Sequence, residues 1–201
     1  GVGNIGSVIN ALEELCCEHM LIENSTDLNV ADSYILPGVG GFSNGMNLLE
    51  KGGWVTAIQD EVLGSSKPIL GICLGMQLLA SSGNEWADGV PRPGLGLIPG
   101  RVVGLRDLGC KLRVPHVGWN DVSCVSESGG LFAGISNETD FYFVHSYMFE
   151  PDNKDHILAI CNYDIAITAA VRSGTIWGVQ FHPEKSSRAG FRMLQNFLEH
   201  S

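Results

Sequence analysis

Apolar residues in the first part of the chain follow two spacings, one helical and one continuous. Val8, Leu12 and Leu15 recur at helical intervals and predict an amphipathic helix near the N-terminus. The runs 34–36 and 68–72 are short apolar stretches with glycine or proline beside them, which is typical of buried strands. Strands that alternate with helices, and are apolar on both faces, favour a parallel sheet with helices on both sides.

The pattern changes after residue 80. Prolines and glycines interrupt any long helix, and several short segments with strand-like patterning follow before a final amphipathic stretch over 191–198. The segments expected to form strands are 95–98, 101–105, 111–114, 141–144, 157–161, 167–171 and 176–181. We therefore expect one domain over residues 1–201, of the α/β class, with a central mostly parallel sheet flanked by helices and an antiparallel flank.

The start of the chain departs from this pattern. An α/β domain of this kind normally has a strand before its first glycine-rich turn, yet the sequence opens in such a turn at Gly1-Val2-Gly3-Asn4. We expect that an N-terminal strand is missing from the sequence. The segment also matches G-x-G-x-x-G, but without that strand and a placed acidic residue it is weak evidence for a dinucleotide site.

Charge and composition exclude several classes of function. Twelve lysines and arginines stand against 22 aspartates and glutamates, so the net charge of −10 repels nucleic-acid backbones and anionic lipids. The apolar runs are far shorter than the roughly 20 residues that span a bilayer, and we expect no secretory signal. We expect a cytoplasmic protein with neither a nucleic-acid nor a membrane partner.

The six cysteines are too sparse for a disulfide framework, and none forms a C-x-x-C pair. Since H-E-x-x-H is also absent, no metal is expected. Five cysteines fit reduced packing residues, whereas Cys73 lies in Gly71-Ile72-Cys73-Leu74-Gly75. This segment has the form of a nucleophile elbow between a predicted strand and a predicted helix, where the helix start stabilises a thiolate. The alternative is a buried core cysteine.

A thiolate nucleophile needs a base, and a group that orients the base. His182 directly follows the predicted strand 176–181, at the edge of the sheet where α/β folds carry their sites, and Glu184 is two residues further on. A solvated histidine-proline turn is an equally good interpretation of this spacing alone. His145, which also ends an apolar strand, competes for the role of base, and His116 is another possible site residue; for both, a structural role is the commoner outcome.

Acyl transfer also needs backbone N–H groups directed at the developing oxyanion. Leu74, as the residue after the candidate nucleophile, supplies one. The second is expected from another glycine-rich turn that follows a predicted strand, Pro37-Gly38-Val39-Gly40-Gly41, although an ordinary turn explains that segment equally well.

Five segments together resemble the triad-type glutamine amidotransferases, and most closely the HisH family, the glutaminase subunits of imidazole glycerol phosphate synthase. These segments are 37–41 (PGVGG), 71–77 (GICLGMQ), 115–120 (PHVGWN), 142–147 (YFVHSY) and 178–186 (GVQFHPEKS). The resemblance covers the whole chain, and the order and spacing of the segments make it specific.

The resemblance implies a role for each matching residue. Cys73 would attack the carboxamide of glutamine, His182 would act as acid and base, and Glu184 would orient His182. A glutamyl thioester would form and be hydrolysed. Leu74 and, after a backbone rearrangement, the Val39-Gly40 turn would hold the oxyanion.

The substrate glutamine would contact Gly40, Gln77 and the segment His145-Ser146-Tyr147, so the resemblance makes His145 part of the ligand site and not the base. Tyr142 and Lys185 match family positions near the subunit interface.

The resemblance also implies a partner, a (β/α)8-barrel cyclase subunit that receives ammonia through a protected tunnel and makes imidazole glycerol phosphate. No cofactor is implied. The alternatives are a paralogous amidotransferase subunit of bacterial amino-sugar synthesis, a stand-alone γ-glutamyl cysteine hydrolase, and a subunit without activity that only docks to a partner.

Overall fold

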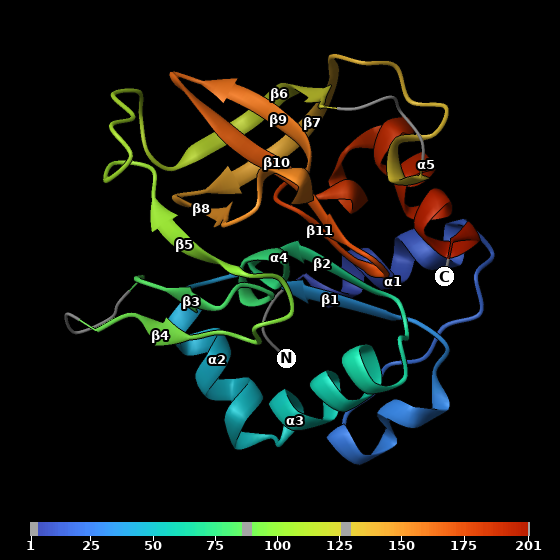
Figure 1. The fold of residues 1–201 in the computed structure, drawn as a ribbon. Coiled ribbons are helices and arrows are strands. Elements are labelled where there is room, and N and C mark those ends of the chain that lie inside the picture. The colour runs from blue at the N-terminus through green and yellow to red at the C-terminus, as the bar shows by residue number, and fades with distance from the viewer. Residues whose placement is uncertain (1–3, 86–89, 126–129, 201) are drawn as a thin grey trace.

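A computed structural model describes residues 4–85, 90–125 and 130–200 and contains two β-sheets with helices packed around them (Figure 1). The helices are α1 (Ile5–Glu14), α2 (Phe42–Lys51), α3 (Trp54–Gln59), α4 (Leu74–Leu78) and α5 (Ser187–Glu199). The strands are β1 (Tyr34–Gly38), β2 (Ile69–Cys73), β3 (Ser82–Gly83), β4 (Arg92–Pro93), β5 (Gly100–Gly104), β6 (His116–Cys124), β7 (Thr139–His145), β8 (Tyr147–Pro151), β9 (Ile157–Tyr163), β10 (Ile165–Ser173) and β11 (Ile176–Val179). Short helical turns lie at Ser25–Val30, Asp60–Gly64, Gly130–Phe132, Lys154–His156 and Pro183–Lys185. The mixed α/β class is confirmed.

The larger sheet has the strand order β1-β2-β11-β10-β9-β6-β7. Parallel pairing joins β1 to β2 and β2 to β11, and the remaining neighbours are antiparallel. The smaller sheet has the order β4-β3-β5-β8, in which β4–β3 and β5–β8 are antiparallel and β3–β5 is parallel. The parallel strands therefore form one end of the sheet, and the antiparallel extension is larger than the sequence pattern indicated.

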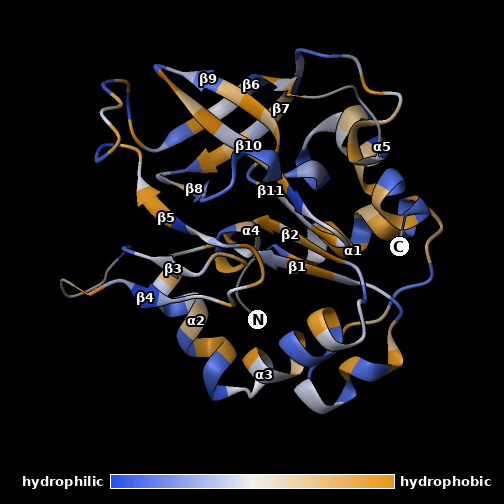
Figure 2. Cartoon of the chain, viewed as in Figure 1, coloured by the Kyte–Doolittle hydropathy of each residue, from blue (hydrophilic) through white to orange (hydrophobic). Residues whose placement is uncertain are grey.

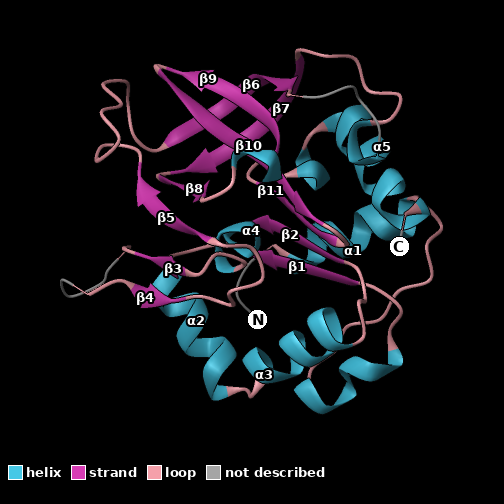
Figure 3. Ribbon diagram, viewed as in Figure 1, coloured by secondary structure: helices cyan, strands magenta, loops and turns pink. Residues whose placement is uncertain are grey.

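Helices cover both faces of the parallel strands, as the apolar runs predicted (Figure 3). Leu70 and Ile72 of β2 belong to a core cluster with residues of α1 and α5, whereas Ile69 belongs to a second cluster with residues of α2, α3 and α4. Figure 2 shows the corresponding alternation of hydrophobic and hydrophilic residues along α2 and α5. The burial of β2 on both faces explains why its sequence does not alternate.

Two of the segments expected to form strands are not strands. Residues 95–98 form a buried loop, in which the backbone N–H of Leu95 donates to Leu78 (2.8 Å) and that of Leu97 to Leu79 (2.9 Å). This loop is apolar because it packs on the end of α4. Residues 111–114 are also a loop, in which the Lys111 N–H donates to the Asp164 carboxylate (2.6 Å).

Four strands in the described part of the chain were not predicted from the sequence. Two of them, β3 and β4, have only two residues each, and the other two are β6 and β8. β6 carries histidine, glycine and asparagine where a strand pattern would have apolar residues, and β8 follows β7 after a single residue. The expected N-terminal strand would precede α1, whose first residue is Ile5, and stays a prediction.

Candidate active site

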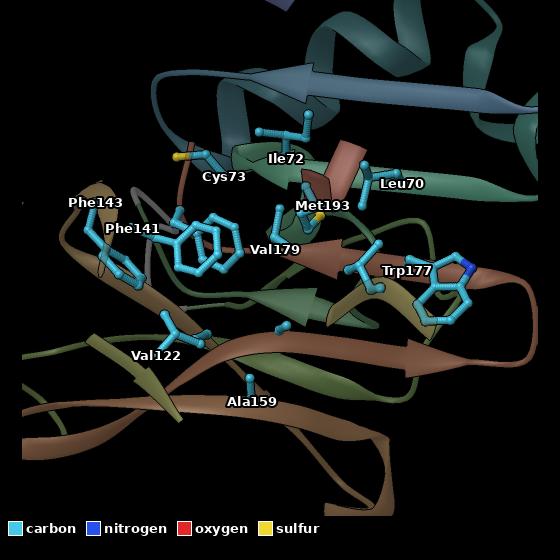
Figure 4. Close-up of a cluster of buried hydrophobic side chains, with 14 of the residues drawn as sticks. Leu70, Ile72, Cys73, Val122, Phe141, Phe143, Ala159, Trp177, Val179 and Met193 are labelled. Carbon is cyan, nitrogen blue, oxygen red and sulfur yellow. The ribbon is translucent and has the colours of Figure 1, made fainter. Parts of the chain in front are cut away.

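Cys73 lies where β2 passes directly into α4, at φ 55° and ψ −109°. Residues with a side chain rarely adopt this positive φ, and a strained turn of this kind is characteristic of a nucleophile elbow. A Cβ added to Gly75 would lie 1.8 Å from the carbonyl oxygen of Leu36, and one added to Gly71 would lie 2.6 Å from that of Gly75. Both positions therefore require glycine because backbone approaches backbone there. Figure 4 shows Cys73 at the end of β2, above the buried Phe141 and Phe143.

His182 and Glu184 form a buried pair beyond the end of β11. The Nδ1 atom of His182 lies 2.9 Å from Oε1 of Glu184, and the exposed fractions of the two side chains are 4% and 0%. Burial alone would lower the pKa of His182, but hydrogen bonds and charges from Cys73 and Glu184 outweigh it and raise the pKa to about 9. Glu184 accepts the Nδ1 proton, so Nε2 is the ring nitrogen free to exchange a proton with Cys73.

The neighbours of His182 fix its position. Phe181 is fully buried and stacks on Phe141 at a centroid distance of 4.1 Å. The backbone N–H of His182 donates to Tyr142 (2.9 Å), and its carbonyl accepts from the Ser186 hydroxyl (2.6 Å). An aromatic stacking contact and two backbone hydrogen bonds thus hold His182 beside the elbow.

Most of the predicted site residues line one pocket of about 340 Å³. The lining comprises Val39, Gly40, Cys73, Leu74, Gln77, Glu85, Pro115, Val144, His145, Ser146, Tyr147, His182 and Lys185. Among the residues predicted from the sequence, Glu184, Tyr142 and the possible site residue His116 are not in this lining. A larger hollow of about 510 Å³ lies between α1 and α5, but all of its polar side chains are at least partly exposed and it contains no predicted site residue.

Two polar residues of the site, half-buried Glu85 and buried Gln180, were not predicted from the sequence. Oε2 of Glu85 accepts the backbone N–H of Phe42 at 2.8 Å, and burial raises the pKa of this carboxyl, partly offset by that hydrogen bond. Gln180 is fully buried next to Cys73. Only its place in the motif GVQFHPE could have marked Gln180, and no local signal marks Glu85.

His145 and His116 form a buried pair beside the pocket. Nδ1 of His145 lies 2.9 Å from the carbonyl oxygen of Tyr147, so it carries the proton, and Nε2 of His145 accepts from Nδ1 of His116 at 2.9 Å. Burial lowers the pKa of His145 to about 3 and that of His116 to about 4. Both rings are neutral and both ring nitrogens of His145 are engaged, which favours a structural position for His145 over the role of base.

The described residues contain neither a cluster of three or more side chains suited to a metal nor a helix long and apolar enough to cross a membrane.

Comparison with known proteins agrees with this geometry. A family model described as "Glutamine amidotransferase class-I" matches residues 1–201, and the chain belongs to this family. A solved structure described as "Crystal structure of glutamine amidotransferase" shares the fold, with a TM-score of 0.75 at 22% identity over 98% of this chain and 94% of that one.

The relatives found by sequence similarity point to one kind of subunit within this family. "Imidazole glycerol phosphate synthase subunit HisH 1" of Prochlorococcus marinus (strain MIT 9313) is 46% identical over 202 residues, which are 98% of this chain and 93% of the relative. "Imidazole glycerol phosphate synthase subunit HisH 2" of Pseudomonas aeruginosa is 41% identical over 199 residues, which are 99% of this chain and 96% of the relative. The predicted resemblance is confirmed.

The neutral histidine pair should make stability depend on pH. Between about pH 6 and 4.5 the unfolded chain binds protons at both histidines and the folded chain does not, so the free energy of unfolding falls as the pH falls. Each histidine contributes a slope of up to about 1.4 kcal/mol per pH unit. Urea unfolding at several pH values should show that the free energy of unfolding of His116→Gln depends less steeply on pH than that of the unmodified protein. The difference should correspond to about one proton fewer taken up on unfolding. Exposed His19→Gln is the control, and an equal flattening in both variants would contradict the assignment.

Proposed function

We propose that the chain hydrolyses glutamine to glutamate and ammonia as the glutaminase subunit of an imidazole glycerol phosphate synthase, in histidine biosynthesis. The observation that carries the proposal is the convergence of a strained elbow cysteine with a buried histidine-glutamate pair in one pocket. The names of the relatives favour this pathway over the amino-sugar alternative. The reaction needs Cys73 as a reduced thiol, and the cytoplasm keeps thiols reduced, so we propose a cytoplasmic location.

The first half-reaction uses Cys73 and His182 as an ion pair. The raised pKa of His182 makes its ring a strong acceptor for the proton of the neighbouring thiol. The thiolate attacks the side-chain carbonyl carbon of glutamine. The C–N bond then breaks, the imidazolium gives its proton to the leaving nitrogen, and ammonia and a Cys73 thioester result.

The second half-reaction releases glutamate. Neutral His182 takes a proton from water, the water oxygen attacks the thioester carbon, and the electron pair of the breaking C–S bond returns to sulfur. Glu184 stays ionised and stabilises the imidazolium that forms again. The cycle thus ends with the same ion pair that began it.

Backbone and side chains of the pocket would hold the substrate. The N–H of Leu74 and the Val39-Gly40 turn serve the oxyanion, and Gly40 has a φ of 103°, in the left-handed region that favours glycine. Gln77 and the segment 145–147 contact the glutamine. Glu85 contributes the carboxylate that suits the α-ammonium group of an amino-acid substrate.

A partner subunit is supported by an apolar surface beside the pocket. Val117, Trp119 and Val144 on β6 and β7 are 55%, 52% and 38% exposed, and the ladder pairs Val117 with Val144 and Trp119 with Tyr142. Val144 also lines the pocket, as does exposed Lys185. Exposed aromatic residues of this kind mark protein interfaces. We assign this surface, with Tyr142 and Lys185, to a (β/α)8-barrel cyclase that receives the ammonia through a protected path.

Replacing the nucleophile tests the chemistry. Cys73→Ala should lower glutamate release by at least about 1,000-fold, because no other group can form the acyl intermediate. A coupled assay for glutamate, with partner and its nucleotide ligand present, measures the rate. The control variant Cys16→Ala removes an exposed thiol and should keep the normal rate of glutamate release. Hydrolysis by a folded Cys73→Ala protein at more than a few per cent of the normal rate would refute the assignment.

Truncating the central aromatic residue of the apolar surface tests the partner. Trp119→Ala should weaken binding to the cyclase by about 30-fold, the loss expected for a buried interface tryptophan. Leu63→Ala is the matched control, since Leu63 is 56% exposed and lies in the turn Asp60–Gly64 that follows α3. Figure 1 shows α3 and β6 at opposite ends of the molecule. Calorimetric titration gives both affinities. Equal affinities for the two variants would place the interface elsewhere.

A further inference from the structure

We propose that Gln180 is a further catalytic residue, whose side-chain amide donates to the sulfur of Cys73 and holds it as the thiolate. The proposal rests on the proposed function, since it assumes that Cys73 is the nucleophile. It goes beyond that function because neither the triad nor the oxyanion contacts involve this side chain.

The geometry places Gln180 against the nucleophile. Its side chain is completely buried, and Nε2 lies 3.8 Å from Sγ of Cys73, within the range of a hydrogen bond to sulfur. Its backbone N–H donates to Ala169 at 2.9 Å, which continues the β10–β11 ladder by one residue. His182, two residues later, reaches the same sulfur. One short segment therefore supplies both the base and a second donor.

A backbone carbonyl determines which end of the Gln180 amide faces Cys73. The carbonyl oxygen of Tyr147 can only accept, so the group of Gln77 that lies 3.0 Å from it must be the Nε2 amide nitrogen. The second hydrogen of that nitrogen then donates to Oε1 of Gln180 at 2.9 Å. This leaves the Nε2 end of Gln180 beside the sulfur, as a donor.

The donor matters only when the sulfur is charged. In its neutral form the thiol of Cys73 donates to the carbonyl of Val144 at 3.7 Å. Once the proton has moved to His182, that carbonyl dipole repels the anion and an N–H donor must replace the lost contact. The thioester sulfur is neutral and a weak acceptor. The amide of Gln180 therefore stabilises the thiolate more than the thioester, both before the attack on glutamine and when the sulfur leaves the acyl group.

The chemical reactivity of Cys73 measures this effect without requiring catalysis. Iodoacetamide alkylates thiolates, and the rate at the Cys73 peptide can be followed by mass spectrometry between pH 5 and 10. Gln180→Leu should move the midpoint of that profile upward by about one pH unit, and Gln180→Glu by more, because a carboxylate faces the anion. Glutamine hydrolysis at neutral pH should fall by about tenfold or more in both variants.

The other titratable groups near Cys73 stay in place in these variants. They are His182 with Glu184 behind it, the neutral His145, and Glu85, Tyr147 and Lys185 in the pocket lining. The matched control is Asn196→Leu, which removes another completely buried amide, on α5, whose contacts are the carbonyls of Leu131 and Ala133. It should lower stability and leave the alkylation profile unchanged.

The outcomes separate this proposal from the proposed function. An unchanged midpoint in folded Gln180→Leu or Gln180→Glu, with Cys73 still essential for hydrolysis, overturns the role of Gln180 alone. A shift equal to that of Asn196→Leu also overturns it, since the effect would then be structural. If Cys73→Ala keeps hydrolysis, the proposed function fails, while the alkylation profile still reports the contact. Gln180→Glu keeps the side-chain volume and serves if Gln180→Leu does not fold.

Discussion

The close approach of β1 to the start of α4 is the constraint on which the site depends. Because Gly75 has no side chain, α4 packs directly on the carbonyl of Leu36, and the chain can turn from β2 into α4 within one residue. That residue is Cys73, held at a positive φ that a free chain would rarely adopt. The buried faces of β2 balance this local strain, so the hydrophobic core directly supports the placement of the nucleophile.

A second organising feature is the polar network within an otherwise apolar region. The carbonyl of Tyr147 accepts from both His145 and Gln77, and so sets the tautomer of one and the orientation of the other. His145 in turn contacts His116 on β6, and Gln77 contacts Gln180, which contacts Cys73. Buried polar groups are costly unless they are satisfied, so this network has few alternative arrangements.

The sequence predicts the parts of the site that depend on neighbours in the chain. The elbow is visible because glycine spacing and strand-to-helix patterning occur within a few residues, and His182 is visible because it ends an apolar strand. The loop 95–98 was misread because burial on α4 gives it the apolar composition of a strand. Glu85 and Gln180 could not be assigned roles, because their partners Phe42 and Cys73 lie 43 and 107 residues away.

In the proposed mechanism a single thiol, activated by His182 and Glu184, attacks glutamine. The most direct test uses a glutamine analogue that carries a diazoketone in place of the carboxamide. One label per chain is expected, on the peptide containing Cys73, with loss of glutamine hydrolysis in proportion to labelling and protection by glutamine. A label on another residue, or full hydrolysis by the labelled protein, would contradict it.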